Sequence, residues 1–546
     1  MGEVRNAERE WDAVVIGTGM GGATLGYALA RAGWRVLFCE KGRFAPGNPA
    51  VLRGAYAETR FSSSGASEAE VLRAAGRYPE AISDLSTGKT RSFVPFIGCG
   101  GGGSTALYGM VLERFFPADF EPEANYPPST ESTLPERWPV SYGDLLPYYE
   151  MAERLYGVRG EGDPLRVGER LERVGCAPPL SPAARDIAAS LTAQGFHPYR
   201  LPLACDYVSG CQGCQGYLCP RECKHDSARS CLAPALEHFG ASLLDECEVV
   251  RLEATHDHVT GVVCRRGDEE FRVSGRVIVL AAGALATPFL LLGSRSAQWP
   301  DGLANSSGLV GRTLMRHYVD LYAIFPKSGQ GTVGNTKELG CNDLYLSEAG
   351  KFGSIQSFGA MPPASLIVDD IQRELRHGVH PLAAAAFGLV KPIARPVLDR
   401  IFARATVVAT VMEDLPYADN RVLPPQGAGP GSLAITYRIR PAEAARIAQF
   451  RRRMKTALSP YWYLLLKQAE NNQRIAHACG TCRFGDDERT SVLDAHNRAH
   501  GLTNLYVVDA SFFPSSGGTN PALTIAANAL RVAAHLIGQD KLEARA

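Results

Sequence analysis

A histidine and an asparagine near the C-terminal end of the chain carry side chains suited to removing a proton from a hydroxyl group. His477 opens the stretch His477-Ala-Cys-Gly-Thr-Cys-Arg-Phe-Gly-Asp-Asp, and Asn520 lies in Gly517-Gly-Thr-Asn-Pro-Ala-Leu-Thr. An imidazole has a pKa near neutrality and can accept a proton. An amide can donate a hydrogen bond to an oxygen without competing for that proton. Taken alone, a histidine beside two cysteines is equally compatible with a core residue or a metal ligand.

A second group of candidate residues is a run of cysteines in the middle of the chain. The 546-residue sequence contains 14 cysteines, and six of them lie in the cysteine-rich insertion 205–231. Cys211, Cys214, Cys219 and Cys223 are spaced closely enough to ligate one zinc ion or one iron–sulfur cluster. In a reducing compartment such clustering indicates metal more than disulfides. Disulfides and free structural thiols remain open as alternatives.

The N-terminal part of the sequence predicts a βαβ unit that binds a dinucleotide. Within residues 11–40, a β-branched run, the turn Gly17-Thr-Gly19-Met-Gly-Gly22, a small-residue helix and a second strand follow one another. Gly17 would permit the tight turn, Gly19 would let the backbone approach a pyrophosphate, and Gly22 would let the helix pack closely on the strand. Glu40, at the end of the second strand, can accept hydrogen bonds from ribose hydroxyls.

Two further stretches identify the dinucleotide. Gly98-Cys-Gly-Gly-Gly-Gly-Ser104-Thr is a glycine-rich loop, and residues 277–288 are typical of a buried strand that runs into a turn and a helix. Together with the stretches around His477 and Asn520, they resemble the glucose-methanol-choline (GMC) family of flavin oxidoreductases. The resemblance implies FAD. An NAD-binding enzyme is the less favoured alternative, because both stretches resemble parts of the family's flavin site.

The resemblance also implies roles for individual residues. His477 aligns with the family's catalytic base, and Asn520 aligns with the partner that orients the substrate oxygen. Asp509 resembles the acid that holds the ribityl chain. Pro521 opens a predicted helix over 522–537, whose N-terminal dipole would stabilise the negative charge of reduced flavin. The remaining expected cofactor contacts are Gly102, Gly103, Ser104, Tyr108, Val249 and Ala510.

Several positions depart from the family pattern or stay ambiguous. The loop 104–110 contains no histidine that could tether the flavin, so we expect non-covalent FAD, and Tyr108 stands where the family usually has an asparagine. His317 is a family-like position for which we expect a structural role. Glu413 and Asp414 could bind polyol hydroxyls or an amine, or could form a surface turn.

The positions of these motifs predict the domain organisation. The flavin-type segments 9–118, 203–315 and 473–540 would together form a Rossmann-like FAD-binding domain. The resemblance implies that 119–202 and 316–472 build a substrate-binding domain on an antiparallel sheet. The expected fold class is therefore α/β combined with α+β.

Composition excludes some classes of partner. The chain has 57 basic and 57 acidic residues, so its formal net charge is zero, and it contains no basic stripe of the kind that binds nucleic acid. We expect the cationic run 451–455 to be a solvated helix face. No stretch approaches the roughly 18 apolar residues of a membrane span, and no signal peptide is visible, so we expect a cytoplasmic protein without a membrane span.

The predicted function is FAD-dependent oxidation of an alcohol group, by hydride transfer to flavin N5 with His477 as the base. Similarity of the His477 loop and of Tyr108 to bacterial sugar- and aminoglycoside-type oxidases and dehydrogenases favours a sugar, cyclitol or glycoside-like substrate. The acceptor would be oxygen or another oxidant. The alternatives are a flavin dehydrogenase with an iron–sulfur relay and a redox-inactive FAD-containing lyase on the same fold. The sequence does not indicate the oligomeric state.

Overall fold

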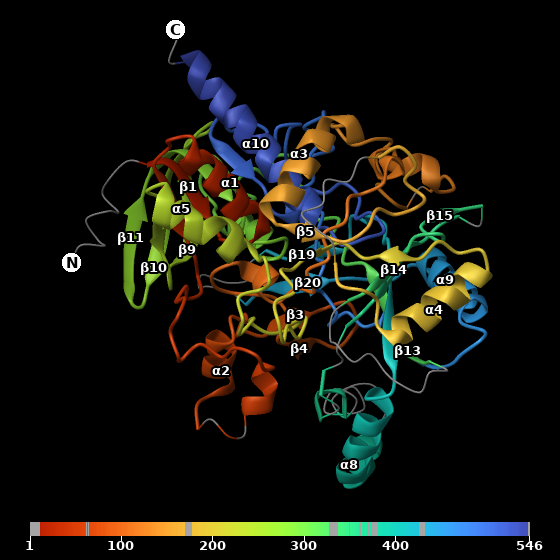
Figure 1. Cartoon of the computed structure of the whole chain (residues 1–546). Helices are drawn as coiled ribbons and strands as arrows, with labels where there is room; N and C mark the ends of the chain where they lie inside the picture. Colours follow the sequence, from red (N-terminus) through yellow and green to blue (C-terminus); the bar gives the residue numbers. More distant parts are fainter. Residues whose placement is uncertain are drawn as a thin grey trace.

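A five-stranded parallel sheet forms the base of one lobe of the computed structural model (Figure 1). The structure describes residues 11–543 except 62, 64, 130, 170–176, 327–336, 349, 360–361, 364, 369–371, 373–380 and 425–431. The strand order is β22 (Leu505–Val507), β12 (Gly275–Leu280), β1 (Trp11–Ile16), β2 (Val36–Cys39) and β8 (Ser242–Leu244). These strands are almost entirely buried, as is typical of a parallel sheet covered on both faces. Three distant parts of the sequence thus meet in one sheet.

Helices cover this sheet, and a second small sheet lies beside it. The helices are α1 (Met20–Arg31), α10 (Ala522–Glu543), α5 (Ala233–His238) and α6 (Ala286–Gly293). The neighbouring antiparallel sheet consists of β9 (Glu248–Ala254), β10 (Val259–Arg266) and β11 (Glu269–Val273). In Figure 1 this sheet lies on the outer side of α5, and α10 runs out towards the C-terminus.

A six-stranded antiparallel sheet forms the base of the other lobe. Its order is β21 (Trp462–Leu466), β13 (Tyr318–Phe325), β18 (Thr406–Met412), β17 (Gly353–Ser357), β14 (Leu339–Cys341) and β6 (Tyr199–Arg200). Helices α4 (Pro182–Ala193) and α9 (Pro441–Ala457) contribute apolar side chains to the same core. The predicted combination of a Rossmann-like parallel sheet with an antiparallel sheet is therefore confirmed.

The two lobes interlock at places that the predicted boundaries do not follow. Strands β3 (Ile82–Asp84) and β4 (Arg91–Phe93) lie in the predicted cofactor segment 9–118, but β3 pairs with β20 (Ala434–Thr436), which also pairs with β19 (Arg421–Val422). Helix α3 (Tyr142–Leu155), from the predicted substrate segment, packs on α10, and the Tyr149 and Thr524 hydroxyls lie 2.8 Å apart. The domain boundaries remain a prediction.

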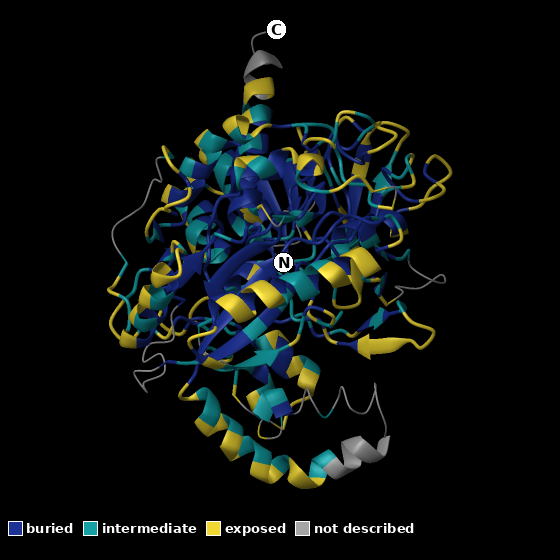
Figure 2. Ribbon diagram, turned by 90° about the vertical axis from the view of Figure 1, so that its right-hand side faces the viewer, coloured by how far each residue is buried: buried dark blue, intermediate teal, exposed yellow. Residues whose placement is uncertain are grey.

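The outer elements are small helices and hairpins. These include α2 (Glu68–Ala74), the pair β5 (Val158–Arg159) and β7 (Leu203–Ala204), and the hairpin β15 (Leu346–Ser347) and β16 (Gly350–Lys351). Helix α8 (Pro381–Phe402) extends beyond the antiparallel sheet, and Figure 2 shows its exposed outer side against the buried strands. Within the described residues, no helix is long and apolar enough to cross a membrane.

The cationic run on α9 differs in part from the expected solvated face. Arg451 donates hydrogen bonds to both carboxylate oxygens of Asp320, at 2.7 and 3.0 Å, and also binds Glu470. Met454 is buried, whereas Arg452, Arg453 and Lys455 are exposed. Because α9 packs along the antiparallel sheet, one side of the run is a structural ion pair and only the other side is solvated.

Candidate active site

The glycine turn after β1 forms an open cradle at the start of α1. Gly17 has φ of 101°, and a Cβ atom there would lie 2.4 Å from the Ala281 carbonyl oxygen. A Cβ at Gly22 would lie 2.2 Å from the Gly17 carbonyl oxygen, so this glycine permits the close contact of helix and strand. A Cβ at Gly19 would meet nothing within 4 Å, and no described side chain caps the N-terminus of α1. These first N–H groups are free to bind a phosphate.

A single cavity of about 1430 Å³ extends from this cradle to His477 and Asn520. Of the predicted cofactor residues, Gly17, Gly19, Glu40, Gly103, Ser104, Tyr108, Val249, Asp509, Ala510 and Pro521 line it. Gly22 and Gly102 lie behind the wall, where they pack against Gly17 and Ala228. The N-terminus of α10 also faces the cavity, through Pro521 and Ala522. Two helix N-termini and a long cleft with a bare backbone edge fit a dinucleotide.

The two predicted acidic contacts are fully engaged with the protein itself. Both oxygens of Glu40 accept backbone N–H groups, from Thr18 on one side and from Gly42 and Gly100 on the other, at 2.9–3.0 Å. Asp509 accepts the Gly283 N–H at 2.9 Å and the Thr287 hydroxyl at 2.5 Å. Burial raises the pKa of both carboxyl groups. Their first role in this structure is therefore to hold the loops that shape the cradle.

The second glycine loop lines the cavity with both glycine backbone and polar side chains. Gly102 and Gly103 have φ of 87° and 50°, and the Ser104 hydroxyl accepts the Gly98 N–H at 3.1 Å. Tyr108 lines the cavity with its ring, but its hydroxyl donates to the His225 carbonyl at 2.5 Å. Burial raises the pKa of Tyr108 well above its ordinary value. The phenol is thus a fixed neutral donor within the protein.

His477 is oriented by His317, a residue for which we expected only a structural role. The two Nδ1 atoms lie 3.0 Å apart, and His317 Nε2 lies 3.1 and 3.0 Å from the carbonyl oxygens of Ser516 and Gly517. Carbonyl oxygens only accept, so His317 Nε2 carries a proton, and with one proton on each imidazole we assign His317 Nδ1 as the acceptor. His477 must then donate from Nδ1, which leaves the lone pair on its Nε2.

This free Nε2 lies beside Asn520. The Asn520 side-chain nitrogen is 3.5 Å from His477 Nε2, and Asn520 Oδ1 accepts from Gln356 Nε2 at 2.9 Å. Burial lowers the pKa of His477 well below 6.5, and the nearby Lys337 ammonium group acts in the same direction. An imidazole that is neutral at neutral pH and has its lone pair beside an amide can act as a general base.

The loop around His317 is held by a carboxylate that the sequence left ambiguous. His317 is completely buried and has φ of 61°, which is uncommon for a residue with a side chain. Asp414 accepts the backbone N–H groups of Arg316 and His317 at 2.7 and 3.1 Å, and the hydroxyls of Tyr437 and Ser516. The surface-turn interpretation of Glu413 and Asp414 is therefore wrong, because both side chains are buried. Neither residue lines the cavity, so the structure does not place them where they could bind a substrate either.

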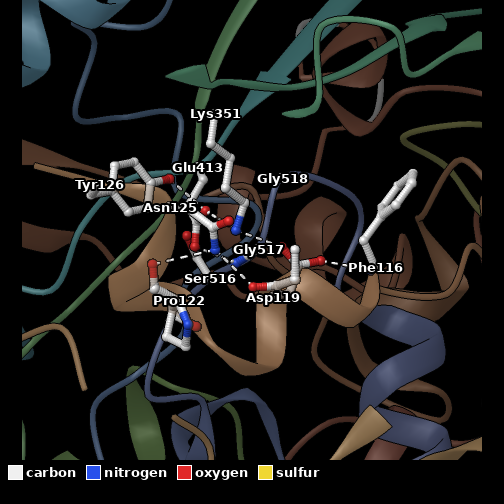
Figure 3. Close-up of polar contacts among 12 residues, drawn as sticks. Phe116, Asp119, Pro122, Asn125, Tyr126, Lys351, Glu413, Ser516, Gly517 and Gly518 are labelled. Carbon is white, nitrogen blue, oxygen red and sulfur yellow. Dashed lines mark hydrogen bonds and ion pairs between the residues drawn. The ribbon is translucent and has the colours of Figure 1, made fainter. Parts of the chain in front are cut away.

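Glu413 belongs to a buried ionic cluster under the loop that carries Asn520 (Figure 3). Lys351 Nζ lies 2.6 Å from both Asp119 and Glu413, and all three side chains are inaccessible to solvent. Glu413 accepts the Gly517 N–H at 3.1 Å and the Tyr126 hydroxyl at 2.6 Å. The Lys351 charge lowers the pKa of Glu413 against the effect of burial. The cluster fixes the loop whose carbonyls set the protonation of His317.

Three other polar residues at this end of the cavity have no sequence signal of their own. Lys337, Gln215 and Gln356 come from the start of β14, from the cysteine-rich insertion and from β17, and all three line the cavity. Burial lowers the pKa of Lys337 to about 8. The pairing of β14 with β17 brings Lys337 and Gln356 to the cavity, and the cysteine-rich insertion brings Gln215 there. No local motif predicts either arrangement.

The predicted metal ligands lie together, but the set of close thiols is larger than predicted. Sulfur–sulfur distances are 3.5 Å for Cys211–Cys223, 3.6 Å for Cys219–Cys223 and 3.7 Å for Cys205–Cys211. Cys214 packs in the same cluster. Cys205 was not among the predicted ligands, because it lies six residues before the compact spacing. All cysteines in the described ranges are free thiols.

Comparison with known proteins identifies relatives along the full length of the chain. Two family models, both described as GMC oxidoreductase, match residues 136–319 and 420–529. Paromamine 6'-oxidase of Streptomyces fradiae is 32% identical over 98% of this chain and 93% of its own length. The 2-methyl-1,2-propanediol dehydrogenase of Mycolicibacterium austroafricanum is 27% identical over 95% and 94%. The solved pyridoxine 4-oxidase from Mesorbium loti has the same fold, with a TM-score of 0.64 at 20% identity over 96% and 99% of the two chains.

Proposed function

Because the chain belongs to the GMC oxidoreductase family of FAD-dependent enzymes that oxidise alcohols, we propose that His477 and Asn520 catalyse the oxidation of a sugar, cyclitol or glycoside-like hydroxyl. His477 Nε2 takes the hydroxyl proton, and the Asn520 amide donates to the same oxygen. When bound, the flavin accepts the hydride from the carbinol carbon. The single observation that carries this proposal is the geometry of the two histidines: His317 Nε2 faces two carbonyl oxygens and its Nδ1 faces His477 Nδ1, which assigns the free lone pair to His477 Nε2.

The proposed cofactor site is the cavity wall between α1 and α10. The cradle at Gly17 and Gly19 would hold the pyrophosphate, and the N-terminus of α10 at Pro521 would stabilise negative charge on the reduced ring. Glu40 and Asp509 would contact ribose and ribityl hydroxyls through lone pairs that they also share with the loops. The other proposed contacts are Gly103, Ser104, Tyr108, Val249 and Ala510, with Gly22 and Gly102 shaping the cradle from behind. The absence of a histidine from 104–110 supports a non-covalent FAD.

The names of two relatives, paromamine 6'-oxidase and the fructose dehydrogenase large subunit of Gluconobacter japonicus, give carbohydrate-like substrates for those proteins and support such a substrate here. Both oxidases and dehydrogenases occur among the relatives, so oxygen and other acceptors are both compatible with the chain. Free thiols throughout the described ranges support a reducing, cytoplasmic setting.

The direct test is anaerobic bleaching of the flavin in the His477→Ala variant. We expect sugar alcohols to bleach the wild-type flavin and the variant to do so about a hundredfold more slowly or worse, which is the usual scale for a lost general base. His238→Ala is the matched control, because this histidine is 66% exposed on α5. An unchanged rate in His477→Ala would contradict the assignment. A wild-type flavin that no alcohol bleaches would instead favour the lyase alternative.

A second proposal concerns the cysteine cluster, for which we infer a metal centre with ligands among Cys205, Cys211, Cys214, Cys219 and Cys223. Thiolates at about 2.3 Å from one tetrahedral ion lie about 3.8 Å apart; the sulfurs of Cys205, Cys211 and Cys223 all lie within 4.8 Å of one another, and Cys219 lies 3.6 Å from Cys223. Gln215 and Gly216, which follow Cys214, line the flavin cavity, so a cluster here could relay electrons from the flavin. Stoichiometric iron in protein purified without oxygen would support an iron–sulfur relay and zinc a structural site, whereas absence of both would refute this proposal.

A further inference from the structure

Three polar groups near His477 have no partner within the described part of the chain. The Oε1 atoms of Gln215 and Gln356 are buried and accept no hydrogen bond. Lys337 is 7% exposed, and its ammonium group makes no hydrogen bond or ion pair to a described residue and lies 5.7 Å from the centroid of the Phe358 ring. All three residues line the cavity. Buried polar groups without partners are rare in folded proteins and commonly mark the place of a ligand.

The three groups converge on one part of the cavity. A Cβ atom built on Gly109 would lie 2.8 Å from Lys337 Nζ and 2.7 Å from Gln215 Oε1, so both groups flank the same point. Gln356 Nε2 donates a hydrogen bond to Asn520 Oδ1, at 2.9 Å. The free Oε1 of Gln356 therefore belongs to an amide that is directly bonded to the candidate catalytic residue Asn520. The space exists because residue 109 is a glycine.

The charge at this point is positive and has no counter-ion. Lys337 contributes to the depressed pKa of His477, which places the ammonium group within electrostatic reach of the candidate base. A buried cation costs several kcal/mol unless an anion pairs with it. A ligand that carries a negative charge would recover that energy.

The acidic residues of the cavity each have a partner in the described structure. Glu58 pairs with Arg77, Glu80 and Glu248 pair with Lys41, and Glu270 pairs with Arg251. Glu40 and Asp509 accept backbone and hydroxyl groups on both oxygens. The second oxygens of Glu58 and Glu80 are buried and accept no hydrogen bond, but each of these carboxylates already has a cationic partner, whereas Lys337 has no counter-ion among the described residues.

We propose that Lys337, Gln215 and Gln356 form a substrate subsite for a polyhydroxylated molecule that bears one carboxylate, as a sugar acid does. Lys337 pairs with the carboxylate, and the two glutamine amides bind hydroxyl groups of the same ring. This inference rests on the proposed alcohol oxidation and narrows its substrate class. An anionic substrate would also distinguish this chain from its relative paromamine 6'-oxidase, because paromamine is an amine.

The test uses three probes that share one ring and differ in charge, namely glucuronate, glucose and glucosamine. Their dissociation constants are measured by calorimetry on the holoenzyme with its flavin reduced and oxygen excluded, so that no turnover can occur. Hydrogen bonds to a charged group contribute about 1.5–3 kcal/mol, so we expect glucuronate to bind about tenfold to a hundredfold more tightly than glucose. Glucosamine should bind more weakly than glucose.

Variants at Lys337 then test the assignment. Lys337→Met should abolish the preference for glucuronate, and Lys337→Arg, which keeps the charge, should retain it. Lys455→Met is the control, because Lys455 is exposed on α9. Gln215→Leu should weaken glucuronate and glucose alike, because it removes a neutral contact.

Two results would overturn the inference. One is binding of the three probes within about threefold of one another, which would mean that the cavity does not read charge. The other is an unchanged preference in Lys337→Met together with a shifted flavin absorbance or midpoint potential, which would place Lys337 on the cofactor. If glucuronate binds in a Lys337-dependent manner but no sugar bleaches the flavin, the subsite stands and the proposed oxidation fails.

Discussion

The contact between His317 and His477 leads to a prediction about a residue that does not itself touch the substrate in the proposed reaction. His317→Leu removes the Nδ1 acceptor that lies 3.0 Å from His477 Nδ1. The buried Nδ1–H of His477 is then left without a partner, which costs about 1–3 kcal/mol. His477 can avoid this cost by moving its proton to Nε2 or by turning its ring. Either change removes the lone pair that faces Asn520.

The size of the effect follows from that energy. A bias of about 1–3 kcal/mol against the productive tautomer lowers its population, and hence the rate of flavin reduction, by about fivefold to a hundred and fiftyfold. His317→Gln is the matched rescue variant, because its amide oxygen can accept from His477. Neither Leu nor Gln is branched at Cβ, so both variants share any cost of the backbone φ of 61° at this position.

The pH profile provides a second readout that a purely structural role would not move. A general base works in its neutral form, so the rate falls as the pH drops through the pKa of His477. Burial is the main cause that lowers this pKa in the wild type. Both substitutions also remove an imidazole whose protonated form, reached only at low pH, repels a proton on His477, so the pKa of His477 should rise and the acid limb should move to higher pH in both.

The assay is stopped-flow reduction of the flavin by a saturating sugar alcohol, repeated at pH values that cover the acid limb of the rate profile. The expected result is a slow His317→Leu variant, a faster His317→Gln variant and a raised acid limb in both. If His317→Leu matches the wild type in rate and profile, the tautomer argument is refuted. Equal losses in both variants with an unmoved limb would show that His317 only supports the fold.

Three further predictions concern the frame of the site. Lys351→Met leaves Asp119 and Glu413 buried without their cation and should lower the free energy of unfolding by about 3–5 kcal/mol, measured by thermal unfolding. The control is Lys467→Met, which replaces an exposed lysine and should not destabilise the protein. Equal melting temperatures of the two variants would contradict the buried cluster. Gly22→Ala should weaken FAD retention, because the new methyl group would lie 2.2 Å from the Gly17 carbonyl oxygen, while Gly538→Ala on α10 meets no atom within 4 Å and should leave retention unchanged. Acid precipitation should release all flavin into the supernatant, and a yellow pellet would disprove non-covalent binding.

The elements that the sequence predicted well are those encoded by neighbouring residues. The order strand, glycine turn, helix and strand over 11–40 was predicted from local pattern, and α1 begins at Met20, inside the glycine turn. Pro521 marks the start of α10 for a similar local reason. The positions of His477 and Asn520 in one cavity were expected from resemblance, and the geometry adds the contact between them.

The features that the sequence did not predict depend on pairing between distant segments. His317 meets His477 across 160 residues because β13 and β18 place Asp414 beside the backbone of His317. Lys337 and Gln356 reach the cavity through the pairing of β14 with β17. Such contacts have no period or spacing in the sequence, since they depend on sheet order and register. The surface-turn alternative for Glu413 failed for the same reason.

Burial gives opposite results for the charged groups of this cavity, according to whether each group has a partner. The acids Glu40 and Asp509 are satisfied by backbone N–H groups, so they serve as fixed supports. No hydrogen bond or ion pair joins His477 to an acid in the described structure, so burial and the Lys337 cation keep it neutral. Lys337 is buried as well, and among the described residues it has an aromatic ring beside it but no counter-ion. The Lys337 cation, which helps to keep His477 neutral, therefore has no counter-ion of its own in the described structure. An anionic substrate would stabilise this cation, and only while the substrate is bound in the cavity that also contains His477.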